Sequence, residues 1–301
     1  MLIWSVSGIA VKHALVVFRP LTLIVLRFTV AVLLMVCVGL LCRRSGLLGL
    51  QMVQKTDLPW FLLGGLFQPF LYYLLETYTY DALSSPTIAG ALLSTNPILT
   101  PLFAVVLLRE SVTRYNVVGI VVATIGVLML TLIGSTDFAI GNVWGILTAF
   151  LAVVAAILYS VALKRIPSRY SPLTIVCYMQ GWSLLLFYVL WGLTDVPQWT
   201  EMQTEWAAAG SHLLTALCSI GYLAVFSSVA GFVLFCYTVR SIGITRTNAF
   251  NNVRPAMTAV FMWLLLGEQL PVGKLIGIVL IIVGLFICQR SRATHSPKRE
   301  E

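Results

Sequence analysis

Apolar segments of about 20 residues follow one another along almost the whole chain, separated by short polar connections. A helix of that length crosses roughly 30 Å of hydrocarbon, whereas a barrel strand would be about half as long and would alternate in polarity. Apolar residues make up 59% of the sequence and charged residues 10%, which excludes an ordinary soluble domain. We predict an all-α integral membrane protein with ten transmembrane helices, at residues 1–17, 20–42, 58–80, 84–108, 113–134, 140–163, 171–193, 211–239, 245–267 and 271–289.

Positive charge is distributed unevenly between the predicted loops. With the N-terminus in the cytoplasm, fourteen of the 19 Lys and Arg residues fall in cytoplasmic loops or the C-terminal tail, and only Lys12, Arg19 and Lys274 fall on the opposite side. Because cytoplasmic loops are enriched in these residues, we predict a multi-pass protein of the inner (plasma) membrane with both termini cytoplasmic. The net charge of +8 then indicates topology and a weak affinity for membrane lipid, and no nucleic-acid partner is predicted.

An internal repeat relates the two parts of the chain. A constant shift of 158 residues, the separation of Pro97 and Pro255, also aligns Phe103 with Phe261, Glu110 with Glu268, Gly119 with Gly277 and Gly126 with Gly284. Each copy holds five predicted spans, and an odd number inverts the second copy in the membrane, as in many secondary transporters. We predict two inverted-topology five-helix repeats, at 1–134 and 140–289, followed by a basic cytoplasmic tail at 290–301.

Several classes of function lack their usual motifs in this sequence. The six cysteines form no CxxC pair or His/Cys cluster, so neither a disulfide framework nor a metal site is predicted. No GxxxxGK[ST] motif is present for ATP, and no Ser/His/Asp or Cys/His arrangement has the spacing of a hydrolase. The polar connections, the longest at 194–210, are too short for a catalytic domain. We therefore predict no cofactor and no enzyme activity, an intramembrane enzyme included.

The ordered motifs of the chain resemble those of the drug/metabolite transporter superfamily, and in particular its EamA-type ten-helix transporters. These motifs are Trp4 with Lys12, Pro20 with Arg27, NPILTPLFAVVLLRE at 96–110 and RPAMTAVFMWLLLGE at 254–268, each block being followed by two glycines. The resemblance covers essentially the whole chain. It implies an inverted five-plus-five bundle around a central cavity that exports amino acids, metabolites or drug-like compounds. Arg254 departs from the family pattern, in which that position is uncharged.

Two arginines lie deep within predicted spans. Arg254 is about nine residues, or roughly 14 Å, from one face, and Arg27 is about seven residues, or some 10 Å, from the other. A charge at such depth is costly, so each arginine must face the bundle interior, water or a counter-anion. Because a planar guanidinium suits a carboxylate or phosphate, we predict that Arg254 binds an anionic or zwitterionic solute, with Arg27 as a further candidate that the family resemblance places there whatever the cargo. The alternative is a structural role, with Arg254 bonded to carbonyls freed at Pro255.

Polar side chains around Pro255 recur at spacings of three or four residues, which places them on a shared helix face, and the equivalent face near Pro97 offers Ser94, Asn96 and Thr100. A proline bends its helix and frees backbone carbonyls, so we predict that Pro97 and Pro255 are hinges of alternating access. Static kinks and interhelical hydrogen bonds are the alternatives. The full predicted substrate-binding set is Arg254, Asn251, Asn252, Asn248, Asn96, Ser94, Arg27 and Tyr72.

Proton coupling and helix packing have their own candidates. His13, Glu76 and Asp81 lie near the predicted outer mouth, and an unperturbed histidine titrates near neutral pH. A solvated histidine without a coupling role is the alternative. The glycine pairs 119/126 and 277/284 each lie on one helix face, which predicts close helix packing and offers a homodimer interface.

These features predict a secondary transporter, an exporter of small metabolites such as amino acids or other carboxylated or zwitterionic solutes, that works by alternating access around a central cavity. The alternative is a non-transporting or partner-dependent membrane subunit, such as a flippase or assembly component, with the same bundle. Proton coupling and facilitated diffusion are equally consistent with the sequence.

Overall fold

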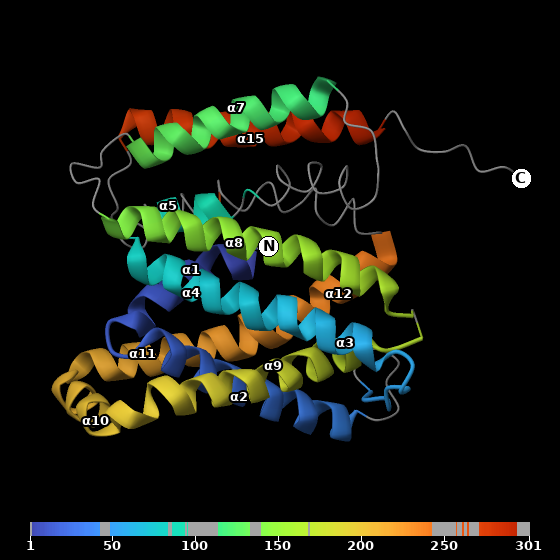
Figure 1. Ribbon diagram of the computed structural model, residues 1–301, viewed down its shortest axis with the longest axis vertical. Helices are drawn as coiled ribbons and strands as arrows, with labels where there is room; N and C mark the ends of the chain where they lie inside the picture. Colours follow the sequence, from blue (N-terminus) through green and yellow to red (C-terminus); the bar gives the residue numbers. More distant parts are fainter. Residues whose placement is uncertain are drawn as a thin grey trace, which may run out of the picture.

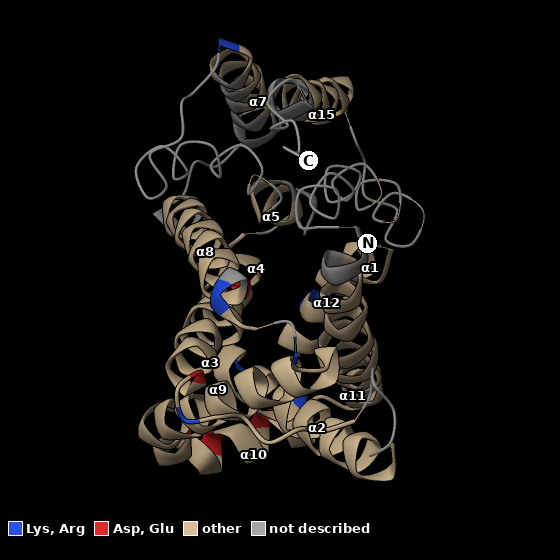
Figure 2. Cartoon of the chain, turned by 90° about the vertical axis from the view of Figure 1, so that its right-hand side faces the viewer, with Lys and Arg blue, Asp and Glu red and all other residues tan. Residues whose placement is uncertain are grey.

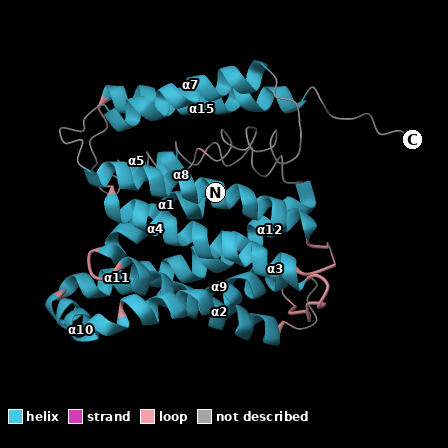
Figure 3. Cartoon of the chain, in the orientation of Figure 1, coloured by secondary structure: helices cyan, strands magenta, loops and turns pink. Residues whose placement is uncertain are grey.

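The computed structural model describes residues 2–42, 49–83, 86–93, 114–132, 140–167, 169–242 and 271–293, with the single positions 95, 257, 261 and 264. Every regular element in these ranges is a helix (Figure 3). The elements are α1 (Leu2–Leu15), α2 (Pro20–Leu41), α3 (Leu58–Gly65), η1 (Leu66–Leu71), α4 (Tyr72–Ala82), α5 (Pro86–Leu93), α7 (Arg114–Leu132), α8 (Ile140–Arg165), α9 (Pro172–Thr194), η2 (Val196–Gln198), α10 (Trp199–Ala208), α11 (Ser211–Tyr222), η3 (Leu223–Ala230), α12 (Gly231–Ile242) and α15 (Val272–Ala293).

Within the described residues, five continuous helical segments are long and apolar enough to cross a membrane. They are Pro20–Leu41, Leu58–Ala82, Val143–Leu163, Pro172–Thr194 and Ser211–Thr238. Viewed end-on, these helices carry few Lys, Arg, Asp or Glu residues (Figure 2). The prediction of an all-helical, multi-pass membrane protein is confirmed, whereas most of the spans predicted at 84–108 and 245–267 lies outside the described residues.

Two of the long helices start in the same way, for a local reason. Both α2 and α9 have proline in their first turn, where the missing N–H would have no helical partner and the fixed φ angle suits a helix. At α9, Ser171 is the N-cap, and its Oγ accepts a hydrogen bond from the Thr174 backbone N–H at 3.1 Å. These signals set the register with which α2 and α9 enter the bundle.

The described helices before residue 133 pack mainly against helices that follow residue 140. In this way α2 contacts α9, α1 contacts α11, α4 contacts α8, and α7 lies along α15 (Figure 1). Apart from α7 and α15, these helices share a large buried cluster, with Phe28 from α2, Tyr73 from α4, Phe187 from α9 and Phe232 from α12 among its members. Helices distant in sequence therefore form a common core.

Glycines bring α7 and α15 close together. A Cβ atom placed on Gly126 would lie 2.6 Å from the Gly277 carbonyl oxygen, and one on Gly284 would lie 2.6 Å from the Gly119 carbonyl oxygen. Such distances exclude any larger side chain unless the backbones separate. The glycine faces predicted to pack closely thus pack against one another within the chain.

The connection expected as a polar loop at 194–210 is largely helical. It contains η2 and α10, and α10 places Trp199, Met202 and Trp206 at spacings of three and four residues. Met202 is fully buried, and the Trp206 ring lies 5.5 Å from that of Phe18, measured between centroids. Burial of this apolar stripe holds α10 against the bundle. A loop was predicted because the stripe is short and lies within a charged segment.

Candidate functional site

Arg27 lies in the interior of α2, with only 1% of its surface exposed. Its Nε donates a hydrogen bond to Ser228 Oγ at 2.8 Å, and its Nη2 donates one to Ser227 Oγ at 3.1 Å. Both acceptors belong to η3, about 200 residues further along the chain. The fork of the guanidinium thus joins α2 to η3.

The π-helical form of η3 explains how two adjacent serines serve this site. In a π-helix the backbone bonds run from i to i+5, which rotates side chains relative to an α-helix and leaves carbonyls available for other donors. Trp4 Nε1 donates to the Ser227 carbonyl oxygen at 3.2 Å, and Gln180 Nε2 donates to the Ser228 carbonyl oxygen at 2.8 Å. Side chains from α1, α2 and α9 therefore all bond to this short segment.

Aromatic rings cover the flat face of the Arg27 guanidinium. Its Cζ lies 4.3 Å from the Tyr73 ring centroid and 5.4 Å from that of Phe28. The negative π faces of such rings attract a cation, and more strongly where water is excluded. These rings hold the guanidinium in place without neutralising its charge.

No carboxylate in the described part of the chain forms an ion pair with Arg27. Its two serine partners, which accept from Nε and Nη2, are neutral hydroxyls. Because a buried permanent cation is costly unless an anion or water compensates it, this arrangement suits an anionic group from a solute.

Tyr72, a predicted site residue, lies next to the ring that faces Arg27. The Tyr72 and Tyr73 ring centroids are 5.2 Å apart, and Tyr72 Oη donates to Glu76 Oε1 at 3.2 Å. Both Tyr72 and Glu76 are buried. The structure therefore brings Tyr72 into the neighbourhood of Arg27 through the Tyr73 ring of α4.

The remaining predicted solute-binding and hinge residues lie outside the described residues. They are Arg254, Asn251, Asn252, Asn248, Asn96, Ser94, Pro97 and Pro255. Their roles stay predictions from the sequence.

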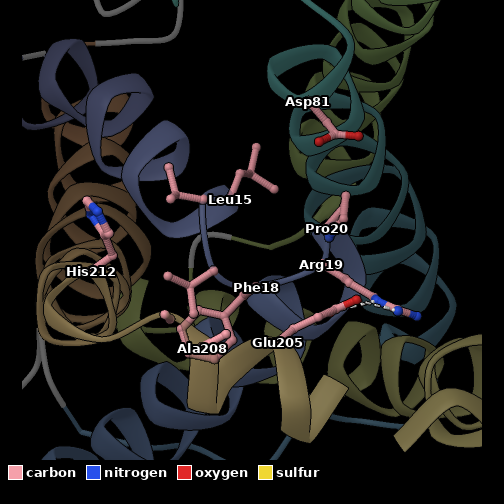
Figure 4. Close-up of a pocket in the computed structure, with 11 residues that line it drawn as sticks. Leu15, Phe18, Arg19, Pro20, Asp81, Glu205, Ala208 and His212 are labelled. Atoms are coloured by element: carbon pink, nitrogen blue, oxygen red, sulfur yellow. Dashed lines mark hydrogen bonds and ion pairs between the residues drawn. The ribbon is translucent and has the colours of Figure 1, made fainter. Parts of the chain in front are cut away.

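A separate hollow of about 500 Å³ lies at the end of the bundle where α1 turns into α2 (Figure 4). Its walls include Phe18, Arg19, Asp81, Glu205 and His212. Asp81 is exposed, as is His13 on α1. No ion pair among the described residues joins His13 to Glu76 or to Asp81, and the coupling role of these three residues stays a prediction from the sequence.

Ion pairs lie at opposite ends of the bundle, one group at α10 and the other at the start of α3 (Figure 1). Arg19 Nη2 lies 2.8 Å from Glu205 Oε1, and this hydrogen bond lowers the pKa of the Glu205 carboxyl. At the other end Arg169 pairs with Asp57, which also accepts a hydrogen bond from Tyr170 Oη at 2.6 Å. The tyrosine and then the arginine lower the pKa of Asp57.

Comparison with known proteins assigns this architecture to a family. Residues 1–132 and 143–289 match the model of the EamA-like transporter family. The chain belongs to that family. The resemblance predicted from Trp4, Lys12, Pro20, Arg27 and the repeated blocks is thereby confirmed.

Individual EamA-like relatives and a solved structure agree with this assignment. An uncharacterized transporter of Archaeoglobus fulgidus is 24% identical, with 96% of this chain and 95% of the relative aligned. A probable terminal-alkyne amino-acid exporter of Streptantibioticus cattleyicolor is 28% identical over 82% of this chain and 78% of its own, and an S-adenosylmethionine/S-adenosylhomocysteine transporter of Chlamydia trachomatis is 27% identical over 94% and 84%. One crystal structure, 19% identical, shares the fold with a TM-score of 0.62 over 95% of this chain and 94% of that one.

Sequence reasoning missed the partners of the EamA-like residue Arg27. Ser227, Ser228 and Gln180 contact it or the segment it binds, yet none belongs to the predicted set. A signal was present, because the paired serines of LAVFSSVA at 223–230 and the lone glutamine at 180 are polar groups within apolar spans. What could not be read from the sequence is that η3 faces α2 and α9.

Proposed function

We propose that this protein is a secondary transporter that exports small carboxylated or zwitterionic metabolites, amino acids among them, by alternating access. The observation that carries the proposal is the burial of Arg27 beside two hydroxyls and two aromatic rings, with no carboxylate partner in the described part of the chain. A guanidinium so placed can receive a carboxylate of the solute through charge-assisted hydrogen bonds.

Two relatives support an amino-acid-like cargo. One is named for the export of an amino acid and another for the transport of S-adenosylmethionine and S-adenosylhomocysteine. Amino acids and these two sulfur compounds share an α-ammonium and an α-carboxylate group. Because the first of these relatives is named as an exporter, export is the proposed direction. Arg254, predicted from the sequence, is a second proposed anion-binding group.

The packing between early and late helices supports two inverted repeats, at 1–134 and 140–289. If the chain contains two equivalent five-helix copies, α1 packs on α11 as α8 packs on α4, and α2 packs on η3 as α9 packs on η1. The π-helices η1 and η3 also occupy the third predicted span of each copy. Because helices of one copy pack against helices of the other, one copy can rock against its counterpart while a solute site stays at their interface. The uneven distribution of Lys and Arg between the loops supports a location in the inner membrane with both termini in the cytoplasm.

Reconstitution of the purified chain alone tests this function. Proteoliposomes loaded with an equimolar mixture of the common amino acids should release a subset of them faster than protein-free vesicles, as measured by mass spectrometry of the external buffer. Arg27→Gln should slow this release at least about tenfold, the cost of losing a charge-assisted hydrogen bond. Ser219→Ala, at a partly exposed position of α11 whose hydroxyl bonds to the Thr215 carbonyl oxygen of its own helix, is the control for reconstitution.

A partner-dependent subunit gives a different result. Its vesicles release no solute until a membrane extract is added, whereas a transporter releases solute by itself. A comparison of medium and cytosol with the protein present and absent then identifies the cargo inside cells.

A further inference from the structure

Gln180 is a buried amide, only 1% exposed, with one end bonded and the other not. Its Nε2 donates to the Ser228 carbonyl oxygen at 2.8 Å. Its Oε1 is the one buried side-chain oxygen or nitrogen in the described residues that has no hydrogen-bond partner. Because a carbonyl oxygen can only accept, the amide atom bonded to Ser228 must be the nitrogen, and the atom left over must be an acceptor.

Other buried polar groups nearby are satisfied, so this acceptor is an exception. Ser183, one turn further along α9, donates its hydroxyl toward the Gly65 carbonyl oxygen at 2.6 Å and the Met179 carbonyl oxygen at 2.7 Å. Native proteins pair nearly all buried polar atoms, because an unpaired one loses the hydrogen bond it had with water. An unpaired acceptor kept at such a position indicates that something else bonds to it.

Arg27 and Gln180 meet at the same residue of η3. Arg27 Nε binds the Ser228 hydroxyl and Gln180 Nε2 binds the Ser228 carbonyl, each at 2.8 Å. A cation that still has donors, from α2, therefore lies near an acceptor that still has lone pairs, from α9. The ligand chemistry that matches both is an anion and a hydrogen-bond-donating cation on adjacent atoms.

We propose that Arg27 and Gln180 form a subsite for the head group of an α-amino acid. The carboxylate of the solute pairs with the Arg27 guanidinium, and its ammonium donates a hydrogen bond to Gln180 Oε1. This inference rests on the proposed function and deepens it, because it names Gln180 as the residue that distinguishes an amino acid from a plain carboxylate.

The described conformation holds this subsite closed, since both side chains are almost fully buried. A solute reaches it when α2 or α9 moves relative to η3. The hydrogen bonds from Arg27 and Gln180 to Ser228 are the contacts that this movement changes. When these bonds to Ser228 break, the head group of the solute supplies new hydrogen-bond partners for Arg27 and Gln180.

A competition assay tests the role of Gln180. Proteoliposomes are loaded with a labelled amino acid and an unlabelled competitor, and release of the label is measured. The competitor is either the same amino acid or the carboxylate that lacks its amino group. The pairs are leucine with 4-methylpentanoate and phenylalanine with 3-phenylpropanoate. In the wild type we expect the amino acid to compete at least about tenfold better, the value of one hydrogen bond to a charged group. In Gln180→Met, which keeps the length of the side chain, this preference should fall close to one.

Two further variants separate recognition from folding. Ser183→Ala removes a satisfied hydroxyl on the same helix, so it should change stability while leaving the preference intact. If Gln180→Met does not fold, Gln180→Leu removes the same acceptor with a shorter apolar side chain, and it should lose the preference for the amino acid as well. A preference kept in Gln180→Leu contradicts the inference.

The assay distinguishes failure of the Gln180 subsite from failure of the transport function. Amino-acid release with an unchanged preference in Gln180→Met overturns the subsite and leaves the transporter standing. A wild-type protein that releases no amino acid overturns both. A preference lost in Gln180→Met and kept in Ser183→Ala supports both.

Discussion

Arg19 Nη2 lies 2.8 Å from Glu205 Oε1, so the turn before α2 is tied to α10. The same guanidinium lies 3.4 Å from Glu201 Oε2 and also donates to Gln198. These contacts border the hollow between α1, α4 and α10 (Figure 4). The side chain of Arg19 therefore holds α10 over one end of the bundle, in a partly exposed setting where each ion pair is individually weak.

We expect Glu205→Gln to loosen α10. The measurement is amide hydrogen exchange of residues 199–208, which should speed up by a few-fold at most, because an exposed ion pair is screened by solvent and contributes little. Glu201→Gln is the matched control, since its longer contact with Arg19 predicts a smaller change. Equal exchange in the wild type and Glu205→Gln would show that the apolar stripe alone holds α10.

This contact should depend on pH with a defined sign. Arg19 lowers the pKa of Glu205 in the folded protein, so the stabilisation is complete above the unfolded-state pKa of Glu, about 4.3, and is lost as the pH falls through the lower folded value. The difference in α10 exchange between wild type and Glu205→Gln should be constant from about pH 7 to about pH 5 and absent near about pH 2. A difference that begins to shrink above about pH 5 contradicts this assignment.

Gly126→Ala should separate α7 from α15. The added methyl would lie 2.6 Å from the Gly277 carbonyl oxygen and 2.8 Å from the Ile281 backbone nitrogen, so the backbones must move, at a cost of about 1–3 kcal/mol. Gly192→Ala in α9 is the matched control, because nothing lies within 4 Å of its Cβ position, and helix propensity then favours alanine by about 1 kcal/mol. Thermal unfolding in detergent should show opposite shifts for the two variants.

Arg27→Lys should not replace Arg27. Lysine keeps the charge, but its compact ammonium cannot bond Ser227 and Ser228 as the guanidinium fork does. We expect amino-acid release to fall by about tenfold or more while the protein remains folded. Release at the wild-type rate in Arg27→Lys would mean that charge alone suffices at this position.

Arg254→Gln tests the arginine that was predicted from the sequence alone. If Arg254 binds the solute carboxylate, the variant should express and fold normally yet lose release of carboxylated solutes, with partial recovery in Arg254→Lys. The yield and the elution profile of the purified protein provide the folding control. Unchanged release would assign Arg254 a structural role at Pro255.

Much of the fold follows from the sequence, because apolar length and helix-start signals are local. The prolines and Ser171 that begin α2 and α9 are visible as residues, and the predicted starts at 20 and 171 agree with the helices to within one residue. The helix α10 was missed because its apolar stripe of Trp199, Met202 and Trp206 is short and interrupted by charge. Helices of that length depend on tertiary contacts, which no local pattern contains.

The candidate site was only partly predictable. Depth along an apolar span singled out Arg27, because a charge in hydrocarbon is costly wherever it lies. Its partners could not be predicted in the same way. Ser227, Ser228 and Gln180 are ordinary polar residues until η3 adopts its π-helical form and packs between α2 and α9.

By itself the sequence determined the membrane class, the helical content and the family, since each depends on composition, segment length or ordered motifs along the chain. The tertiary structure decided which helices pack together, that Arg27 bonds to Ser228 rather than to a carboxylate in the described residues, and that Gln180 keeps an unpaired oxygen there. The physical reason is that hydrophobic burial is non-directional, so it drives the helices together without choosing their neighbours. Hydrogen bonds and glycine contacts are directional and short, and they exist only once the neighbours are chosen.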